Sequence, residues 1–413
     1  MSNVKHNKEC LACGSENLTV ALDLGDQPLA NSYLTDENDP EDRYPLGVNL
    51  CKDCYHLQLP VTVNPEIIYK NYLYVSGTSK TLHDYSDWFA GYVTESMVRK
   101  TYNILDIGCN DGTQLDYFKS RGFDTFGIDP AENLYPTSSA KHEIICDFFG
   151  PGVVSKVKDI FDAITAQNVF AHSPNPLEFL ETCKKLMADH TMLFIQTSQA
   201  DMILNNEFDT IYHEHVNFFN INSMNELAKR AGLFLIDAIK TPIHGNSYLF
   251  VLCKPSSAFP IAVKQRPYNV ENGIKMEGKL QDLNTYVQWE SNVRANMDEL
   301  KKIILAYQHL GYKVIGYGAA AKGNTLLNFI DVKLDLVIDD NPLKQNLYLP
   351  GTRVLIRGSD AITEFSSDDK IVFIPLAWNF FSEIGRRIKM LRKNPNDLFL
   401  RYFPTVEITH AYA

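Results

Sequence analysis

The chain has 413 residues, of which 45% are hydrophobic and 22% are charged, and it carries a formal net charge of −11. Because a single hydrophobic core does not organise a chain of this length, two or three domains are expected. The negative charge, with no basic stripe to offset phosphates, excludes nucleic acid as the expected partner. The apolar runs are too short for a membrane span and the N-terminus has no apolar signal core, which predicts a cytoplasmic protein without membrane contact.

Two C-x-x-C pairs stand within residues 1–70, which we predict to form a small zinc-binding domain. Four thiolates in two pairs can complete one tetrahedral Zn²⁺ site and staple a segment that has little core of its own. A redox pair or chance spacing is the alternative, but neither pair has a thioredoxin-like βαβ context. A closed structural site without room for substrate is expected. Its predicted ligands are Cys10, Cys13, Cys51 and Cys54.

Residues 71–254 are predicted to form an α/β domain, and they begin with an aromatic and hydroxyl-rich segment at 71–79. This segment is either a surface linker with its tyrosines in a domain contact or a loop that folds over a cleft. In the second case Tyr74 would offer its phenol to the reacting substrate. A helix is expected at about 80–99.

One βαβ unit spans residues 102–129. The strand at 104–107 leads into a glycine turn, which is followed by a helical pattern and a second strand that ends in Asp129. Asp129 is placed to accept hydrogen bonds from a ribose. The turn reads D-I-G-C-N-D-G, in which acids would repel a pyrophosphate and attract an amino group and a sulfonium. A turn without ligand and an NAD site are the alternatives.

This turn resembles the first motif of the class I S-adenosylmethionine-dependent methyltransferases. The resemblance implies a Rossmann-like domain that binds S-adenosylmethionine. The expected contacts in this unit are Asp106, Gly108, Asn110, Gly112 and Asp129.

Further polar residues follow the later strands of the same domain. Ligands of an open parallel sheet lie beyond the carboxyl ends of the strands. Asp147 is expected to meet the adenine amino group, and Gln167 or Asn168 to hold the methionine portion, although each is equally well explained as a turn residue. His172 follows the predicted strand at 160–166.

The segment I-Y-H-E-H-V-N-F-F concentrates groups that move protons or hold developing charge. Tyr212, Glu214 and His215 are the candidates, with a plain polar loop as the alternative. Zinc is disfavoured because H-E-H lacks the spacing of H-E-x-x-H. Downstream, the loop at His244 either closes the pocket or is an ordinary β-turn.

The last third of the chain predicts a linker at 255–280, a packing helix at 281–309, and a second Rossmann-like unit. Its turn, G-Y-G-A-A-A-K-G-N, has no acid before it and places Lys322 at a helix N-terminus, which suits a phosphate or diphosphate. Asp339 follows at the position that an NAD site requires. A purely structural duplicate domain is the alternative.

Together with Q-P-L-A-N-S-Y-L between the cysteine pairs, these motifs resemble the NDP-hexose 3-C-methyltransferases of deoxysugar biosynthesis over nearly the whole chain. In that family a loop tyrosine, a histidine after the fourth strand and Tyr-x-Glu-His line the active site. The resemblance implies that Tyr74 (with Tyr72 a near rival), His172, Tyr212, Glu214 and His215 are catalytic. It also implies that the C-terminal domain binds the nucleotide sugar, and the predicted substrate contacts are Gly318, Lys322, Asn379 and His244.

The expected fold is α/β: a class I methyltransferase domain (71–254) flanked by a small zinc-binding domain (1–70) and, after the linker, a second Rossmann-like domain (281–413). S-adenosylmethionine and a structural Zn²⁺ are the expected cofactors, and a nucleotide-diphosphate sugar is the expected partner. The expected reaction is methylation at carbon 3 of a 4-keto-6-deoxyhexose through an enolate. An NAD(P)-dependent oxidoreductase, an O- or N-methyltransferase and a zinc-binding adaptor are the alternatives. A monomer is expected, but the sequence leaves the oligomeric state open.

Overall fold

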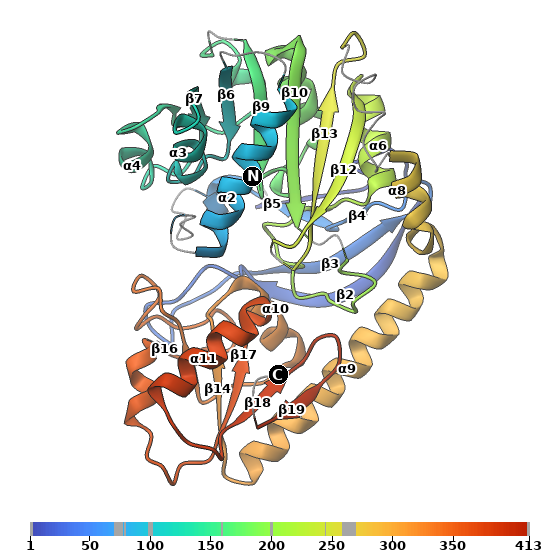
Figure 1. Cartoon of the computed structure of the whole chain (residues 1–413). Coiled ribbons are helices and arrows are strands. Elements are labelled where there is room, and N and C mark those ends of the chain that lie inside the picture. Colours follow the sequence, from blue (N-terminus) through green and yellow to red (C-terminus); the bar gives the residue numbers. More distant parts are fainter. Residues whose placement is uncertain are drawn as a thin grey trace. The chain divides into compact units, whose positions relative to one another are not determined.

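The computed structural model describes residues 3–69, 77, 80–97, 102–157, 160–198, 201–243, 245–257 and 270–410. The chain forms two compact units, each built from separated stretches of sequence (Figure 1). The first unit comprises Met1–Thr19, Asn49–Asp201 and Glu214–Leu283, and the second comprises Val20–Val48, Met202–His213 and Asn284–Ala413. Among the helices that the structure describes, none has the length and apolar character needed to cross a bilayer.

The first unit is organised around a seven-stranded sheet in the order β12-β13-β10-β9-β6-β7-β8. Strands β6 to β10 run parallel, whereas β13 pairs antiparallel with both β10 and β12. The central strands β6, β9, β10 and β13 are buried over most of their length, because helices cover both faces of the sheet. Their bounds are β6 Tyr102–Ile107, β7 Phe123–Ile128, β8 Glu143–Ile145, β9 Phe161–Gln167, β10 Met187–Ser198, β12 Phe234–Thr241 and β13 Ser247–Cys253.

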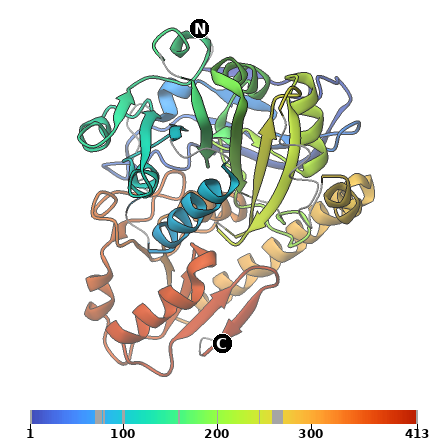
Figure 2. The same cartoon turned by 45° about the horizontal axis from the view of Figure 1, so that its top comes forward.

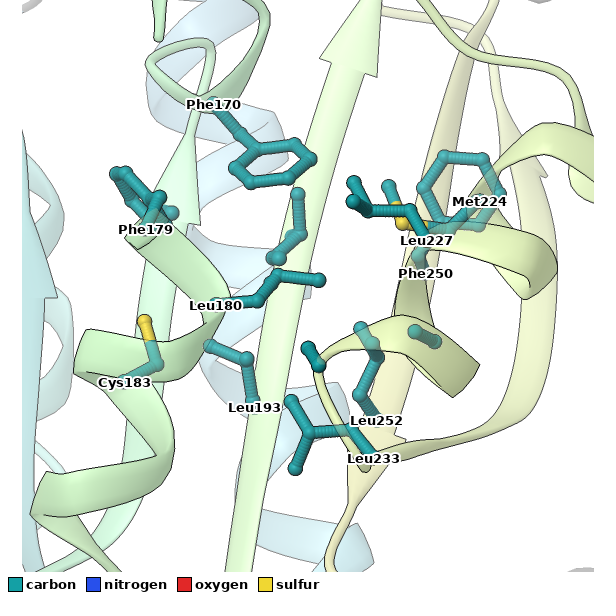
Figure 3. Close-up of a cluster of buried hydrophobic side chains, with 14 of the residues drawn as sticks. Phe170, Phe179, Leu180, Cys183, Leu193, Met224, Leu227, Leu233, Phe250 and Leu252 are labelled. Atoms are coloured by element: carbon teal, nitrogen blue, oxygen red, sulfur yellow. The ribbon is translucent and has the colours of Figure 1, made fainter. Parts of the chain in front are cut away.

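Two hydrophobic clusters hold helices to the two faces of this sheet. On one face, α2 (Lys80–Ser96) and α3 (Thr113–Lys119) pack through Phe89 and Phe118 (Figures 1 and 2). On the other, α5 (Pro176–Leu186) and α6 (Ile221–Arg230) pack against β10 and β13. Figure 3 shows side chains of this second cluster from α5 and α6 on either side of the strand that carries Leu193. The sheet therefore has a fixed carboxyl edge at which loops can present ligands.

The cysteine-rich part of the first unit is made of short strands. β1 (Val4–His6) pairs antiparallel with β5 (Val61–Val63), and β4 (Leu57–Gln58) pairs with the end of β3 (Arg43–Cys51) and with β11 (Asn217–Phe218). The remaining short elements of this unit are α1 Pro65–Tyr69, α4 Tyr135–Ser139, η2 Pro151–Val153, η3 Phe170–His172, α8 Val270–Met276 and η4 Gly278–Gln281.

The second unit is also α/β, with a six-stranded sheet in the order β16-β15-β14-β17-β18-β19. Only the pairing of β18 with β19 is antiparallel. The core lies between this sheet and α11, whose Phe381, Ile384 and Ile388 face β14 and β17 residues. The bounds are β14 Lys313–Tyr317, β15 Leu336–Ile338, β16 Ile356–Arg357, β17 Ile371–Pro375, β18 Leu398–Arg401, β19 Glu407–Thr409, α9 Leu283–His309, α10 Ala321–Ile330, α11 Phe381–Leu391, η5 Ser359–Glu364 and η6 Trp378–Phe380.

The predicted α/β fold with two Rossmann-like sheets and an N-terminal cysteine cluster is confirmed. The compact units nevertheless interleave in sequence, unlike the predicted domains. Residues 20–48, which include most of β2 (Leu18–Pro28), belong to the second unit, where Tyr33 donates to the Ala319 carbonyl oxygen at 2.6 Å. Helix α8 lies inside the range predicted to be a linker, and its Gly273 is buried. The domain boundaries therefore stay predictions.

Candidate active site

The glycine turn after β6 brings backbone to the carboxyl edge of the first sheet. Gly108 has φ +71°, and a Cβ there would lie 2.9 Å from the Val169 side chain. Its N–H donates to the Ile128 carbonyl oxygen at 2.8 Å. Gly112 has φ +85° and caps α3. Only glycine takes both the left-handed backbone and the close packing without strain, so the predicted glycine turn forms here.

Asp129, at the end of β7, is oriented by backbone donors. The N–H of Asn110 donates to Oδ2 at 2.8 Å and that of Ala131 donates to Oδ1 at 2.9 Å. Burial is the main cause that raises the pKa of this carboxyl. A carboxylate fixed in this way at the edge of a Rossmann-like sheet can accept hydrogen bonds from ribose hydroxyls.

Asp106 lies inside β6 and is 2% exposed. The Thr165 hydroxyl of the neighbouring strand donates to its Oδ1 at 2.7 Å. Burial raises the pKa of Asp106 to about 7, and the nearby Asp129 adds to the rise. Asp106 is therefore a buried acid behind the turn. A cationic ligand group close to it would favour the deprotonated, charged carboxylate.

The other predicted cofactor contacts occupy neighbouring strand ends. Asp147 is bound to Lys156 Nζ at 2.5 Å and to the Phe148 N–H at 2.8 Å, and the Lys156 hydrogen bond lowers its pKa. Gln167 ends β9 and accepts from the Tyr85 hydroxyl at 3.0 Å. Asn168 has φ +56° and its N–H donates to the Gln196 carbonyl oxygen at 3.1 Å. The adenine and methionine roles given to these residues stay predictions.

Gln196 on β10 is a candidate that the sequence did not reveal. It pairs in register with Gln167 and is fully buried. Within the described ranges, neither amide atom of Gln196 nor Nε2 of Gln167 has a hydrogen-bond partner. Buried amides are expected to be paired. The two glutamines therefore offer donors and an acceptor to a polar ligand group at this edge. A glutamine at the end of an apolar run does not by itself predict such a role.

His172 and His215, which are 43 residues apart in sequence, lie together at this edge. Their ring centroids are 5.2 Å apart. Tyr69 stacks on His172 at 5.6 Å, and its hydroxyl donates to the Glu214 carbonyl oxygen at 3.2 Å. Burial lowers the pKa of His172 to about 4, so its imidazole is neutral near pH 7. The structure thus joins three predicted catalytic residues, His172, Glu214 and His215, within the first unit.

The remaining predicted catalytic residues are placed differently. Tyr212 is half-buried and belongs to the second unit. Tyr74 and His244 lie outside the described residues. His213, which was left out of the predicted set, is 2% exposed and contacts the Tyr44 carbonyl oxygen at 3.3 Å, as a packing residue would.

The four N-terminal cysteines form one cluster. Their sulfur atoms all lie within 4.8 Å of one another, with 3.5 Å between Cys10 and Cys54 and 3.6 Å between Cys13 and Cys51. Tetrahedral Zn²⁺ with Zn–S bonds of about 2.3 Å requires sulfur separations of about 3.8 Å. The donor set therefore fits a structural Zn²⁺ held by Cys10, Cys13, Cys51 and Cys54.

In the second unit, the predicted substrate contacts surround the turn after β14. Gly318 has φ +93°, and a Cβ there would lie 3.0 Å from Ala377 Cβ, in the turn after β17. Lys322 stands in the first turn of α10, and its Nζ lies 4.7 Å from the centre of the Trp378 ring. Asn379 follows Trp378 in η6 and is half-buried. Gly318, Lys322 and Asn379 therefore gather at one sheet edge.

Asp209 is a second candidate that the sequence did not reveal. It is fully buried, and its Oδ2 accepts from Trp378 Nε1 at 2.9 Å. Its Oδ1 and the Lys322 Nζ are both buried without a hydrogen-bond partner within the described part of the chain. Burial raises the pKa of Asp209 to about 6, and Lys322 opposes the rise. This acid and base flank Trp378 and are available to a polar ligand.

Three protein families match the chain in succession. A putative zinc binding domain matches 10–69, a methyltransferase domain matches 79–238, and a C-methyltransferase C-terminal domain matches 242–404. The C-methyltransferase NovU of Streptomyces niveus is 27% identical over 91% of both chains. A ubiquinone biosynthesis O-methyltransferase of Coxiella burnetii is 23% identical over 41% of this chain and 78% of its own.

Among solved structures, a methyltransferase of Archaeoglobus fulgidus that depends on S-adenosylmethionine is 14% identical with a TM-score of 0.35, over 42% of this chain and 94% of its own. By the three family matches, the chain is an S-adenosylmethionine-dependent methyltransferase with an N-terminal zinc-binding domain and a C-terminal region that matches a C-methyltransferase C-terminal domain.

Proposed function

We propose that this enzyme transfers a methyl group from S-adenosylmethionine to carbon 3 of a nucleotide-linked 4-keto-6-deoxyhexose. The observation that carries the proposal is the pairing of His172 and His215 at the edge where the Gly108 turn lies. A carbon next to a ketone is acidic enough to lose a proton only if a base and an oxyanion donor act together. The relationship to a C-methyltransferase over 91% of the chain supports carbon as the acceptor.

His215 is the proposed base, because an imidazole binds a proton near neutral pH. His172 is poorly suited to this role, since burial lowers its pKa to about 4. A neutral His172 instead retains one ring N–H that can donate to the enolate oxygen. Tyr212 is the other proposed donor, and the roles of His172 and Tyr212 are interchangeable. Glu214 would orient His215 or hold a sugar hydroxyl.

In the proposed reaction, the proton on carbon 3 passes to His215 and the electron pair of the C–H bond spreads onto the 4-oxygen. Donors aligned on such an oxyanion are each worth roughly 3–4 kcal/mol. The carbanion would then form the new C–C bond to the transferred methyl group, while the S–CH3 bond of bound S-adenosylmethionine breaks and leaves its electron pair on sulfur as S-adenosylhomocysteine. Bound S-adenosylmethionine supplies an electrophilic methyl group that needs only in-line placement. Tyr74 is proposed to offer its phenol to the sugar.

The nucleotide portion of the substrate is proposed to bind the second unit. Gly318 would let the backbone approach the diphosphate, Lys322 would neutralise it at the N-terminus of α10, and Asn379 would donate to it. The buried Lys322 Nζ has no hydrogen-bond partner among the described residues, which supports this proposal. His244 is proposed as a further substrate contact.

The test is product analysis after incubation with a panel of 4-keto nucleotide sugars that differ in sugar and base. Wild-type enzyme is expected to add one methyl group on carbon, and solvent deuterium is expected to enter carbon 3 without the methyl donor. His215→Asn should abolish both reactions while S-adenosylhomocysteine binds within about threefold of wild type. His213→Asn, two positions away, is the matched control and should keep most of the activity. Normal turnover by His215→Asn would refute the assignment of the base.

Two other functions remain as alternatives. An NAD(P)-dependent oxidoreductase is favoured by Asp339, which is held by two backbone N–H groups in the second unit as Asp129 is in the first. Fluorescence titration with NADH would reveal such a site. An O- or N-methyltransferase would need fewer proton-handling groups, and mass spectrometry of the product from a carbon-deuterated sugar would identify it by retention of every deuterium.

A further inference from the structure

Asn217 follows His215 by two positions, and its side chain is directed at the turn that carries His172. Its Nδ2 donates to the Ser173 carbonyl oxygen at 2.8 Å and to the Ala171 carbonyl oxygen at 3.4 Å. These two carbonyls flank His172 in the chain. Because Asn217 is fully buried, its amide is shielded from water and holds the backbone on both sides of the histidine.

The orientation of the Asn217 amide is fixed by a histidine next to the cysteine cluster. His56 Nε2 lies 3.2 Å from Asn217 Oδ1. Since Oδ1 has no hydrogen to give, the ring must donate from Nε2, which selects that tautomer. His56 is fully buried against Phe219, with ring centroids 4.6 Å apart. Its carbonyl oxygen accepts from the Cys51 N–H at 2.9 Å, within the second cysteine pair.

The backbone of the His215 segment is attached to the strand that follows the second cysteine pair. Residues Asn217 and Phe218 form β11, which pairs with β4, and the Leu59 N–H donates to the Val216 carbonyl oxygen at 2.9 Å. On the far side, the Asn222 amide donates to the Cys54 carbonyl oxygen at 3.1 Å. Both histidine-bearing segments therefore rest on the cysteine-rich part of the first unit.

We propose that Asn217 and His56 are positioning residues that carry the rigidity of the cysteine cluster to His172. The expected loss of kcat rests on the proposed function. The placement of the His172 ring by Asn217 and His56 does not depend on that function. The cysteine cluster then does more than fold its own segment: it sets where the His172 ring stands relative to His215. A displacement of about 1 Å in a catalytic group can cost about 100-fold in rate.

The experiment compares Asn217→Ala with Asn222→Ala, which removes an amide of the same kind that donates to the Cys54 carbonyl oxygen and not to the His172 turn. Protein labelled with ¹⁵N-histidine is examined by NMR, with the His172 signals identified from a His172→Asn sample. Asn217→Ala should shift or broaden the His172 ring signals and lower kcat about 100-fold with little change in KM. The Zn²⁺ content and the affinity for S-adenosylhomocysteine should stay at wild-type levels. Asn222→Ala should leave the His172 signals and kcat unchanged.

Replacement of His56 provides an independent comparison if Asn217→Ala does not fold. His56→Gln keeps a side-chain N–H for Asn217 and should retain most of kcat, whereas His56→Leu should reproduce the loss. The proposal is overturned if the His172 signals survive Asn217→Ala, or if His56→Gln and His56→Leu behave alike. The NMR comparison needs no substrate. Absence of methylated product from wild type would therefore refute the proposed function alone.

Discussion

The two glycine turns of the chain, one in each unit, share a backbone arrangement and differ in the charge that lines it. Gly108 and Gly318 both have positive φ, at +71° and +93°, and each N–H donates to the last residue of the next strand. Asp129 and Asp339 each accept two backbone N–H groups. The spacing is the same in both, since 318 − 108 and 339 − 129 both equal 210.

The side chains at equivalent positions are opposite in character. The first turn has Asp106 two residues before its glycine, where the second has Gly316. At the start of the following helix, the first turn has Gly112 and the second has Lys322. The comparison teaches that an acid after the second strand does not identify the ligand. The charge around the turn does, and it favours a cationic amino group and sulfonium in the first unit and a phosphate in the second.

Replacement of the acids at the two strand ends, one at a time, should give the largest difference in ligand affinity between the two turns. Asp129→Ala removes a charged acceptor from the ribose, and two such hydrogen bonds are worth enough to lower the affinity for S-adenosylhomocysteine about 100-fold. Asp339→Ala is the matched control in the second unit and should leave that affinity unchanged. Isothermal titration calorimetry measures both. Equal losses in the two variants would show that the ligand does not select the first turn.

Lys322→Gln should have a smaller effect, confined to the second turn. The loss of one ammonium from a diphosphate site should weaken binding of a nucleotide sugar about tenfold and reduce its dependence on salt. Lys370→Gln serves as control, because Lys370 is exposed and its backbone pairs with Lys313 at the opposite, amino end of β14. Unchanged nucleotide-sugar affinity in Lys322→Gln would contradict a phosphate role for this turn.

Local patterns in the sequence were sufficient to predict both glycine turns. Each glycine, the acid that follows the next strand and the apolar strands themselves depend on residues close in the chain, so period and spacing identify them. The cysteine pairs were recognised because metal ligands have restricted spacings, and the four sulfurs meet as predicted. His172 and His215 were joined by resemblance to a family, and the structure confirms that they are neighbours.

Contacts between segments that are distant in the chain could not be predicted from the sequence. Asp209 meets Trp378 across 169 residues, and Asn217 meets His56 across 161. An isolated aspartate or asparagine in an apolar run carries no local sign of its partner. Residues 20–48 also make contacts of this kind, since Asn324 in α10 donates to the Ala30 carbonyl oxygen across 294 residues.

The smallest predicted effect is a pH dependence that belongs to the first turn alone. Burial raises the pKa of Asp106 from 3.8 to about 7. The folded protein therefore binds more protons at this group than the unfolded chain between these values. Its contribution to stability is complete below pH 3.8 and is lost as the pH rises through about 7. Asp106→Asn should accordingly raise the melting temperature at pH 8.

A cationic ligand group near Asp106 favours the charged carboxylate, so binding should release a proton. The affinity for S-adenosylhomocysteine should then rise about threefold between pH 6 and pH 8, and Asp106→Asn should flatten this rise. Asp147→Asn is the control, because the Lys156 hydrogen bond lowers the pKa of Asp147 and keeps its titration below this window. If Asp106→Asn retained the rise, the acid before Gly108 would not sense the ligand's charge, and the contrast between the two turns would rest on Lys322 alone.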